Sequence, residues 1–353
     1  MPLADARQTP SATEGSSPPV QARSTTGAAH VVAPARLHLG FLDLNGGLGR
    51  RFGSIGLAID QPRTDLILTR SPTLSADGPD NERALAALDR FVAALSLDRS
   101  YRVDIQSAIP PHSGLGSGTQ LALAVGSALA VLEGLDHSPD TLGEMVNRGA
   151  RSTIGIASFT DGGFIVDGGR GSQAKAPPIL MRAAFPETWR ILLILDRSAA
   201  GVHGEAETKA FSTLPPLPEV AAGHVCRLVL MQLVPGMIES DIAVFGAAIS
   251  EIQSIIGSHF AAAQGGPWTS AAVGRIAGAL KSAGAYGIGQ SSWGPTGFAF
   301  APTQEIACRL YESVIEDARA EGLEILIGRG RNRGASVERI TNTKTERHEG
   351  EQA

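Results

Sequence analysis

Apolar and polar positions divide the chain into a strand-rich first half and a helix-rich second half. Residues 30–44 alternate apolar and polar side chains, which predicts a half-buried strand. Residues 54–60 and 65–70 have the same character, and Gln61-Pro62-Arg63 between them predicts a turn. Residues 101–110 predict another strand. Residues 84–95, with apolar side chains three and four positions apart, predict a helix.

The second half predicts mainly helices. Residues 138–151 open with Ser-Pro, a helix start signal. Residues 164–169 and 189–196 predict central strands, and residues 296–301 and 323–328 two more. Helices are expected over residues 203–211, 220–238, 241–256, 269–283 and 303–321. Strands first and helices later, with some mixing, favour an α+β fold.

Both ends of the chain differ from the rest in composition. Residues 1–29 are rich in Ser, Thr, Pro, Ala and Gln and lack the apolar stretch of a secretion signal, so they predict a disordered leader. Residues 341–353 predict a solvated, disordered tail. The folded part is therefore expected over residues 30–340.

Composition excludes several classes of protein. The chain has 353 residues, of which 43% are hydrophobic, and a formal net charge of -5, so we expect a globular protein that binds no nucleic acid. Its two cysteines, Cys226 and Cys308, lie apart in apolar helical stretches, which indicates buried thiols in a reducing cytoplasm. No run reaches the ~20 apolar residues that cross a bilayer, so no membrane partner is expected.

Residues 110–134 (PPHSGLGSGTQLALAVGSALAVLEG) combine a glycine-rich loop with an apolar helix. Glycines let the backbone approach an anion, and the free N–H groups of a first helical turn hold negative charge. The spacing matches neither G-x-G-x-x-G nor G-x-x-x-x-G-K-[ST]. Phosphate binding is our interpretation, and a glycine-rich helix start without a ligand stays open. The phosphate-binding candidates are Ser113, Gly114, Leu115, Gly116, Ser117, Gly118 and Thr119.

This loop resembles the second motif of the GHMP kinases, P-x-x-x-G-L-G-S-S-A, with Gly118 where a second serine usually stands. Residues 34–40 (PARLHLG) are similar to the opening motif of that superfamily, and residues 287–300 (GIGQSSWGPTGFAF) to its third. The resemblance implies a GHMP-kinase-like two-lobed fold. The N-terminal lobe, residues 30–175, would be ribosomal protein S5 domain 2-like, and the C-terminal lobe, residues 176–340, ferredoxin-like.

One position departs from the kinase pattern. Kinases of this superfamily carry a catalytic aspartate in a stretch like S-G-x-D-x-A, and the aligned position here is Ala157. Alanine cannot accept a proton. Asp161 could supply a base in another register, and that alternative stays open. A phosphate site without the kinase base indicates a polyphosphate used differently. An ATP-dependent small-molecule kinase and a silent binding protein are the alternatives.

Longer stretches of the sequence resemble one particular family within this superfamily. Residues 34–59, 114–126, 151–169, 201–211 and 290–300 together resemble β-ribofuranosylaminobenzene 5'-phosphate synthase. That family implies a phosphoribosyltransferase of tetrahydromethanopterin biosynthesis. It would condense phosphoribosyl pyrophosphate with 4-aminobenzoate or 4-hydroxybenzoate and release carbon dioxide and pyrophosphate, leaving a C-riboside 5'-phosphate. It also implies Mg²⁺ (or Mn²⁺) and a homodimer.

Under this interpretation, several polar residues become site candidates. Asp43 could stabilise the ribosyl cation, Arg50 could pair with a carboxylate or phosphate, and His38 could hydrogen-bond the substrate. Ordinary loop charges and a buried strand histidine are the alternatives. Trp293 could stack on the arene or pack in the core. The substrate-binding candidates are Arg36, Asn45, Arg151, Ser152, His203, Glu205, Ser291 and Ser292, with Glu207 nearby; the metal candidates are Ser117 and Glu144.

Overall fold

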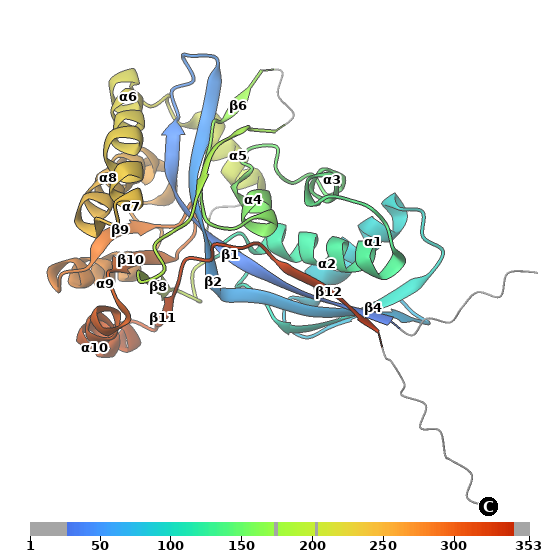
Figure 1. Cartoon of the computed structure of the whole chain (residues 1–353). Coiled ribbons are helices and arrows are strands. Elements are labelled where there is room, and N and C mark those ends of the chain that lie inside the picture. Colours follow the sequence, from blue (N-terminus) through green and yellow to red (C-terminus); the bar gives the residue numbers. More distant parts are fainter. Residues whose placement is uncertain (1–26, 173–175, 202–203, 342–353) are drawn as a thin grey trace, which may run out of the picture.

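The computed structural model describes residues 27–172, 176–201 and 204–341, which form two lobes around two β-sheets (Figure 1). The first sheet has the order β12-β1-β2-β4-β3, with β5 and β6 pairing with β2 and β7 pairing with β5. Its strands are β1 Gly27–Asp43, β2 Arg50–Ser71, β3 Ser75–Asp77, β4 Ser100–Ser107, β5 Phe164–Asp167, β6 Arg170–Gly171, β7 Ile179–Ala183 and β12 Ser336–Thr341.

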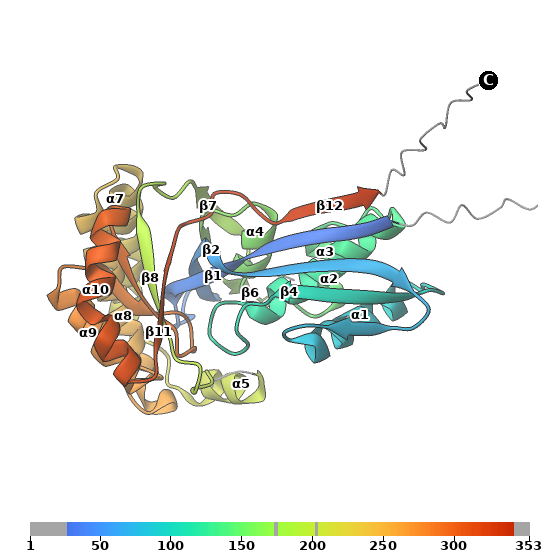
Figure 2. The same ribbon diagram turned by 90° about the horizontal axis from the view of Figure 1, so that it is seen from below.

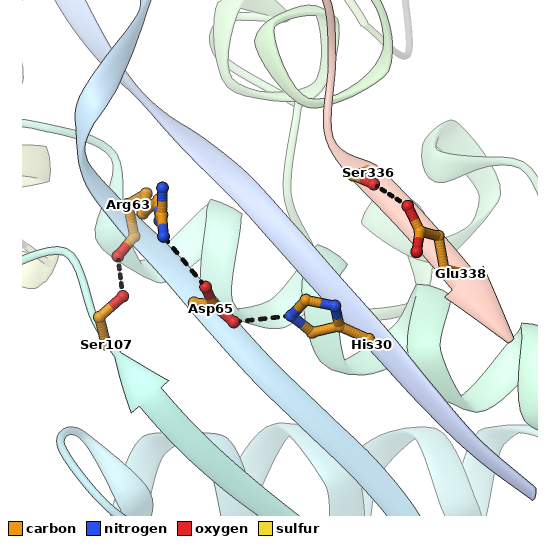
Figure 3. A network of polar contacts seen from close by, with 6 residues as sticks. All are labelled: His30, Arg63, Asp65, Ser107, Ser336 and Glu338. Carbon is orange, nitrogen blue, oxygen red and sulfur yellow. Dashed lines mark hydrogen bonds and ion pairs between the residues drawn. The ribbon is translucent and has the colours of Figure 1, made fainter. Parts of the chain in front are cut away.

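Helices cover one face of this sheet, and a network of polar side chains lies on the other face near the start of β1 (Figure 3). The helices of this lobe are α1 Asn81–Ala94, α2 Ser117–Glu133, α3 Pro139–Met145 and α4 Ile154–Thr160. Ala29 and Val31 of β1 are fully buried in the core that α1 and α2 form, because alternate strand residues point to one face. His30 points to the opposite face, where its Nε2 lies 2.8 Å from Asp65 Oδ1 (Figure 3).

Strand β2 runs without interruption through the turn predicted at residues 61–63, so that prediction was wrong. The Gln61-Pro62 peptide is cis, and the register with β1 shifts between Pro34 and Ala35. Pairing with β1 holds both ends of β2 in line. On its other side β2 pairs first with β5 and then with β4. Tertiary pairing thus overrides the local signal of the proline.

The second sheet, in the order β11-β8-β10-β9, is antiparallel throughout. With α9 and α10 packed on one face, this is the order of a ferredoxin-like βαββαβ unit, as expected for the C-terminal lobe. Its elements are β8 Arg190–Leu195, β9 Tyr286–Gln290, β10 Gly297–Ala301 and β11 Glu324–Gly328, with α9 Ala271–Ser282 and α10 Gln304–Ala320. The segments α5 Gly204–Thr213, α6 Glu219–Leu228, η1 Val229–Leu233, α7 Val234–Ile238 and α8 Ile242–Gln264 lie between β8 and β9 in the sequence.

The two lobes share strands and core. Strand β12, at the end of the chain, pairs antiparallel with β1 of the first sheet, and β7 pairs with β5 (Figure 1). The chain therefore does not separate into units at residue 175. Strand β1 also begins at Gly27, so residues 27–29 of the predicted leader are strand. The remaining leader and tail residues, 1–26 and 342–353, lie outside the described residues.

The helix predicted over residues 138–151 is much shorter. Helix α3 ends at Met145, and Asn147 and Gly149 then take left-handed backbone conformations (φ 56° and 85°) that no α-helix contains. Ser138 caps the helix start by accepting a hydrogen bond from the Thr141 N–H. The result is a loop over residues 146–153 that connects α3 to α4.

The continuous helical segment Glu219–Ile238, formed by α6, η1 and α7, is long and apolar enough to cross a membrane by length and composition alone, with a mean hydropathy of 1.4. Core helices of globular proteins have the same composition. Val225, Leu233 and Met237 of this segment are buried in the core that it forms with α8.

Candidate functional site

The glycine loop ends where α2 begins. Gly114 and Gly116 have φ of 81° and 82°, conformations that favour glycine, and Gly116 is the residue before the first turn of α2. The N–H groups of Thr119 and Gln120 both bond to the Gly116 carbonyl. The N–H groups of Ser117 and Gly118 precede these two in the first turn of α2. Backbone N–H groups at this position have no partner within the helix, so they can bind an anion.

Two side chains from distant segments hold the loop in place. Arg36 donates from Nη1 to the Gly114 carbonyl, and its own N–H bonds to the Leu115 carbonyl at 3.0 Å. Ser291 Oγ donates to the Gly114 carbonyl at 2.8 Å and accepts the His38 N–H at 3.0 Å. Ser291 is fully buried, so it positions the loop between β1 and the third motif. Ser113 is occupied similarly, donating to the Pro110 carbonyl at 2.7 Å.

Three glycines from three segments meet beside this loop. A Cβ on Gly294 would lie 2.2 Å from the Ser113 carbonyl oxygen, and a Cβ on Gly114 would lie 2.2 Å from that of Ser291. A Cβ on Gly201 would lie 2.6 Å from the Trp293 carbonyl oxygen. The loop, the segment after β8 and the third motif can approach this closely only because these positions carry no side chain.

A pocket of about 840 Å³ opens next to the start of α2. Figure 2 shows α5, which forms one wall, between the two lobes. Strand β1, the loop at 147–152 and α5 supply most of the lining. The lining residues are Arg36, His38, Phe41, Thr119, Asn147, Arg148, Gly149, Ala150, Arg151, Ser152, Gly204, Glu205, Glu207, Lys209, Ser212 and Ser292. The pocket thus brings together eight predicted residues: Arg36, His38, Thr119, Arg151, Ser152, Glu205, Glu207 and Ser292.

Cations outnumber anions in this pocket. Its lining contains three arginines and Lys209, against Glu205 and Glu207. Arg151 Nη1 lies 2.7 Å from Glu207 Oε1, and its guanidinium carbon lies 5.0 Å from the centre of the Phe211 ring. Burial lowers the pKa of Arg36 to about 10, which keeps it charged at neutral pH. The pocket therefore suits an anionic ligand.

His38 and Phe41 give the pocket an aromatic, uncharged surface. The two ring centres are 4.4 Å apart. Burial first, and the charge of Arg36 second, lower the pKa of His38 to about 3, so the imidazole is neutral at physiological pH. Trp293, by contrast, is 2% exposed and stacks on Phe260 at 4.0 Å, so of the two expectations for it the structure bears out core packing.

A buried carboxylate, which the sequence reasoning missed, shapes the pocket loop. Asp167 is fully buried and accepts four hydrogen bonds. The donors are Ser152 Oγ at 2.8 Å and the N–H groups of Thr153, Ser54 and Gly169 at 3.2, 3.0 and 3.0 Å. Burial raises the pKa of this carboxyl, and the hydrogen bonds oppose that rise. Asp167 thereby fixes Ser152 at the pocket wall.

Three predicted site residues do not line the pocket but hold the turn between β1 and β2. Asp43 Oδ1 accepts the N–H groups of Asn45 and Gly46 at 2.6 and 2.9 Å. Asn45 Nδ2 donates to the Leu217 carbonyl, and Arg50 donates to the carbonyls of Gly168 and Gly169. These hydrogen bonds give all three residues a structural role. Catalytic roles for Asp43 and Arg50 stay predictions.

The position of the kinase aspartate is apolar. Ala157 lies in α4 and packs against Ile154 and Ile165. Asp161, the alternative, is exposed at the C-terminal end of α4 and does not line the pocket. His203, a further candidate, lies outside the described residues.

The protein oxygens at the pocket fit Mg²⁺ only if water and the substrate supply the remaining ligands of the ion. Among the described residues no three His, Cys, Asp or Glu side chains cluster as metal ligands. Mg²⁺ at phosphate sites is usually held by one or two carboxylates plus substrate oxygens, and Glu205 is a pocket carboxylate outside the Arg151–Glu207 pair. Glu144 is exposed on α3 and does not line the pocket, and Ser117 begins α2.

Sequence reasoning also missed most of the loop over residues 146–153. Arg148 and Asn147 line the pocket, as do Phe41 and Lys209. Arg148 stands three residues before Arg151 in the sequence. A second arginine this close to a predicted site residue was the available signal.

The chain matches known families over both lobes. The models for the GHMP kinases N terminal domain and the GHMP kinases C terminal match residues 82–169 and 233–319. The structure is similar to L. major mevalonate kinase, with a TM-score of 0.67 and 15% identity over 86% of this chain and 96% of that one. At this identity the likeness concerns the fold, which is the GHMP kinase fold.

Similarity in sequence is closer to another group. A protein of Methanothermobacter thermautotrophicus named beta-ribofuranosylphenol 5'-phosphate synthase is 35% identical over 86% of this chain and 96% of its own length. A protein of the same name from Archaeoglobus fulgidus is 32% identical over 86% of this chain and 98% of its own length. The chain therefore belongs to the beta-ribofuranosylphenol 5'-phosphate synthase family, built on the GHMP kinase fold.

Proposed function

We propose that this protein condenses phosphoribosyl pyrophosphate with 4-hydroxybenzoate or 4-aminobenzoate to form a C-riboside 5'-phosphate, in tetrahydromethanopterin biosynthesis. The relatives' names contain a phenol, which favours the hydroxybenzoate. The observation that carries the proposal is a cation-rich pocket at the start of α2, with alanine at the position of the kinase base. A cytoplasmic homodimer without nucleic acid or membrane partners is part of the same proposal.

The bond changes balance without a net proton transfer. The ribose C1–O bond breaks, and its electron pair leaves with pyrophosphate. The ring carbon that carries the carboxylate bonds to C1. The carbon–carboxylate bond then breaks, carbon dioxide leaves, and its electron pair restores the aromatic ring. A pocket with a neutral His38, and with Ala157 in place of a base, is compatible with this chemistry.

The residues of the pocket divide into two roles. The amides at the start of α2, together with Arg36 and Lys209, would stabilise the negative charge that grows on the leaving pyrophosphate. The rings of Phe41 and His38 would support the arene. When bound, Mg²⁺ (or Mn²⁺) would neutralise part of the pyrophosphate charge, and Glu205 is the residue we expect to hold it.

The direct test is to incubate the protein with phosphoribosyl pyrophosphate, Mg²⁺ and carboxyl-labelled 4-hydroxybenzoate or 4-aminobenzoate. We expect labelled carbon dioxide and pyrophosphate in equal amounts. Absence of labelled carbon dioxide with both benzoates would contradict the proposal. ATP consumption with a small alcohol would support a kinase instead.

A matched pair of lysine variants connects the reaction to the pocket. Lys209→Gln, on the pocket wall, should lower kcat/KM roughly ten-fold, which is about 1.4 kcal/mol of transition-state stabilisation. Lys281→Gln removes an exposed lysine at the end of α9, outside this pocket, and should leave kcat/KM unchanged. Equal effects of the two substitutions would mean that this pocket is not where the reaction occurs.

A further inference from the structure

A second, smaller cavity lies beside the start of α2. Its volume is about 180 Å³, and α1, α2 and the loop over residues 146–153 supply its walls. The lining residues are Arg83, Ala86, Ala87, Arg90, Gly118, Leu121, Ala122, Val146 and Arg148. Arg148 also lines the large pocket, so the two spaces meet at this residue.

Arginines converge on the helix start inside this cavity. A Cβ on Gly118 would lie 2.8 Å from Arg83 Nη2 and 3.2 Å from Arg148 Nη2. The guanidinium groups therefore occupy the space that a side chain at residue 118 would need. GHMP kinases usually carry the second serine of the motif at this position. The glycine that stands here in its place leaves room for these arginines.

The positive charge in this cavity is poorly compensated. Arg83 Nη1 lies 3.0 Å from Asp80 Oδ2, whereas Arg90 and Arg148 have no carboxylate partner among the described residues. Burial, and then the charges of Arg83 and Arg90, lower the pKa of Arg148. Like charges this close raise the free energy of the unliganded protein, and a bound anion would relieve that repulsion.

The large pocket and the small cavity differ in the charges of their linings, so each suits a different kind of anion. The large pocket contains Glu205 and Glu207, so it can accept a diphosphate together with Mg²⁺. The lining of the small cavity contains arginines and apolar residues but no carboxylate. Such a site fits a phosphate monoester that needs no metal, because guanidinium groups bind phosphate oxygens in bidentate pairs.

We propose that the cavity formed by Arg83, Arg90, Arg148 and Gly118 binds the 5'-phosphate of the phosphoribosyl donor, while its diphosphate lies in the large pocket. This assignment rests on the proposed function. The donor carries anionic groups at both ends of its ribose, and Arg148 stands between the two spaces. The 5'-phosphate remains in the product, so the same cavity would hold the product until release.

The test measures binding by calorimetry with two separate probes, ribose 5-phosphate and Mg²⁺-pyrophosphate. Arg90→Gln should weaken ribose 5-phosphate binding roughly ten-fold and pyrophosphate binding less than two-fold. Arg148→Gln should weaken both. Arg309→Gln, which removes an exposed helical arginine on α10 without an ion pair among the described residues, should change neither.

The outcomes separate the proposals. If Arg90→Gln leaves ribose 5-phosphate binding unchanged, or weakens pyrophosphate binding equally, the subsite assignment is wrong. If ribose 5-phosphate binding falls as expected but the wild-type protein releases no carbon dioxide from either benzoate, the reaction is wrong and the subsite stands. A Tm measurement separates weaker binding from loss of fold in Arg90→Gln. Arg90 is exposed, and its removal lowers the repulsion between the arginines, so the Tm should not fall.

Discussion

His38 shows how strongly this pocket changes the behaviour of a single residue. The pKa of its imidazole is about 3 in the native protein, against about 6.5 in an unfolded chain. Between these pH values the unfolded chain binds a proton that native His38 does not. The free energy of unfolding therefore falls as the pH drops below about 6.5, by roughly 1 kcal/mol per pH unit from this group. Above that pH the group contributes no pH dependence.

His38→Asn should remove that contribution. We expect the free energy of unfolding, measured in urea at several pH values, to depend less steeply on pH in the variant than in the wild type below about pH 6.5. Phe41→Leu is the control, because it removes the neighbouring ring but no titrating group, so stability falls and the slope stays. Equal slopes for His38→Asn and the wild type would mean that His38 titrates over the same pH range in the native protein as in the unfolded chain.

The residues that line the pocket were easier to predict from the sequence on strand β1 than in loops. Arg36 and His38 follow a recognised motif on a strand whose direction is fixed, and both line the pocket. Asp43 and Arg50 were predicted from their charge and their place in the first motif region, but both make hydrogen bonds that hold the turn between β1 and β2. Arg148 and Asp167 depend on a loop conformation set by Asn147 and Gly149, which no local periodicity encodes.

At the level of elements, the meeting of three glycine segments should be intolerant of a single methyl group. Gly294→Ala would place Cβ 2.2 Å from the Ser113 carbonyl oxygen and 2.3 Å from the Gly114 N–H nitrogen, so the glycine loop must move. We expect a loss of about 2 kcal/mol in the free energy of unfolding. We also expect a higher KM for the phosphoribosyl donor, since the loop amides shift. Urea unfolding and steady-state kinetics measure the two effects.

Gly278→Ala is the matched control for that substitution. Gly278 lies inside α9, and a Cβ there meets no heavy atom within 4 Å. Alanine should therefore stabilise the protein by roughly 0.5–1 kcal/mol, through helix propensity alone, and leave KM unchanged. If Gly294→Ala were as stable as the wild type, the close contact of the three segments would be wrong.

Local signals explain why most elements were predictable and some pairings were not. The helices expected from residues 241, 269 and 303 begin within two residues of these positions, and Asp241, Ser270 and Thr303 cap them through their side chains. Strand β2 passes straight through the predicted turn because β1 pairs along both of its ends. The pairing of β12 with β1 joins residues more than 300 positions apart, which periodicity cannot reveal.

At the scale of the whole molecule, the two lobes share one hydrophobic core. The largest cluster of buried side chains takes Leu37 and Ile55 from the first sheet and Leu193 and Phe298 from the second, together with residues of α6 and α8. Neither lobe can bury this surface alone. Strands β7 and β12 add backbone hydrogen bonds that close the N-terminal sheet with residues from the second half of the chain.

Such a shared core should make unfolding cooperative across both lobes, unlike two domains joined by a linker. Scanning calorimetry should give one transition whose calorimetric and van't Hoff enthalpies agree. The fragment 30–175 lacks β7, β12 and about two thirds of the shared core, so it should bind hydrophobic dyes and show no cooperative transition. Two resolved transitions, or a cooperatively folded fragment, would contradict this prediction. The pocket would then lie between independent domains, whereas a single cooperative unit holds β1, α5 and the glycine loop around it in one fixed arrangement.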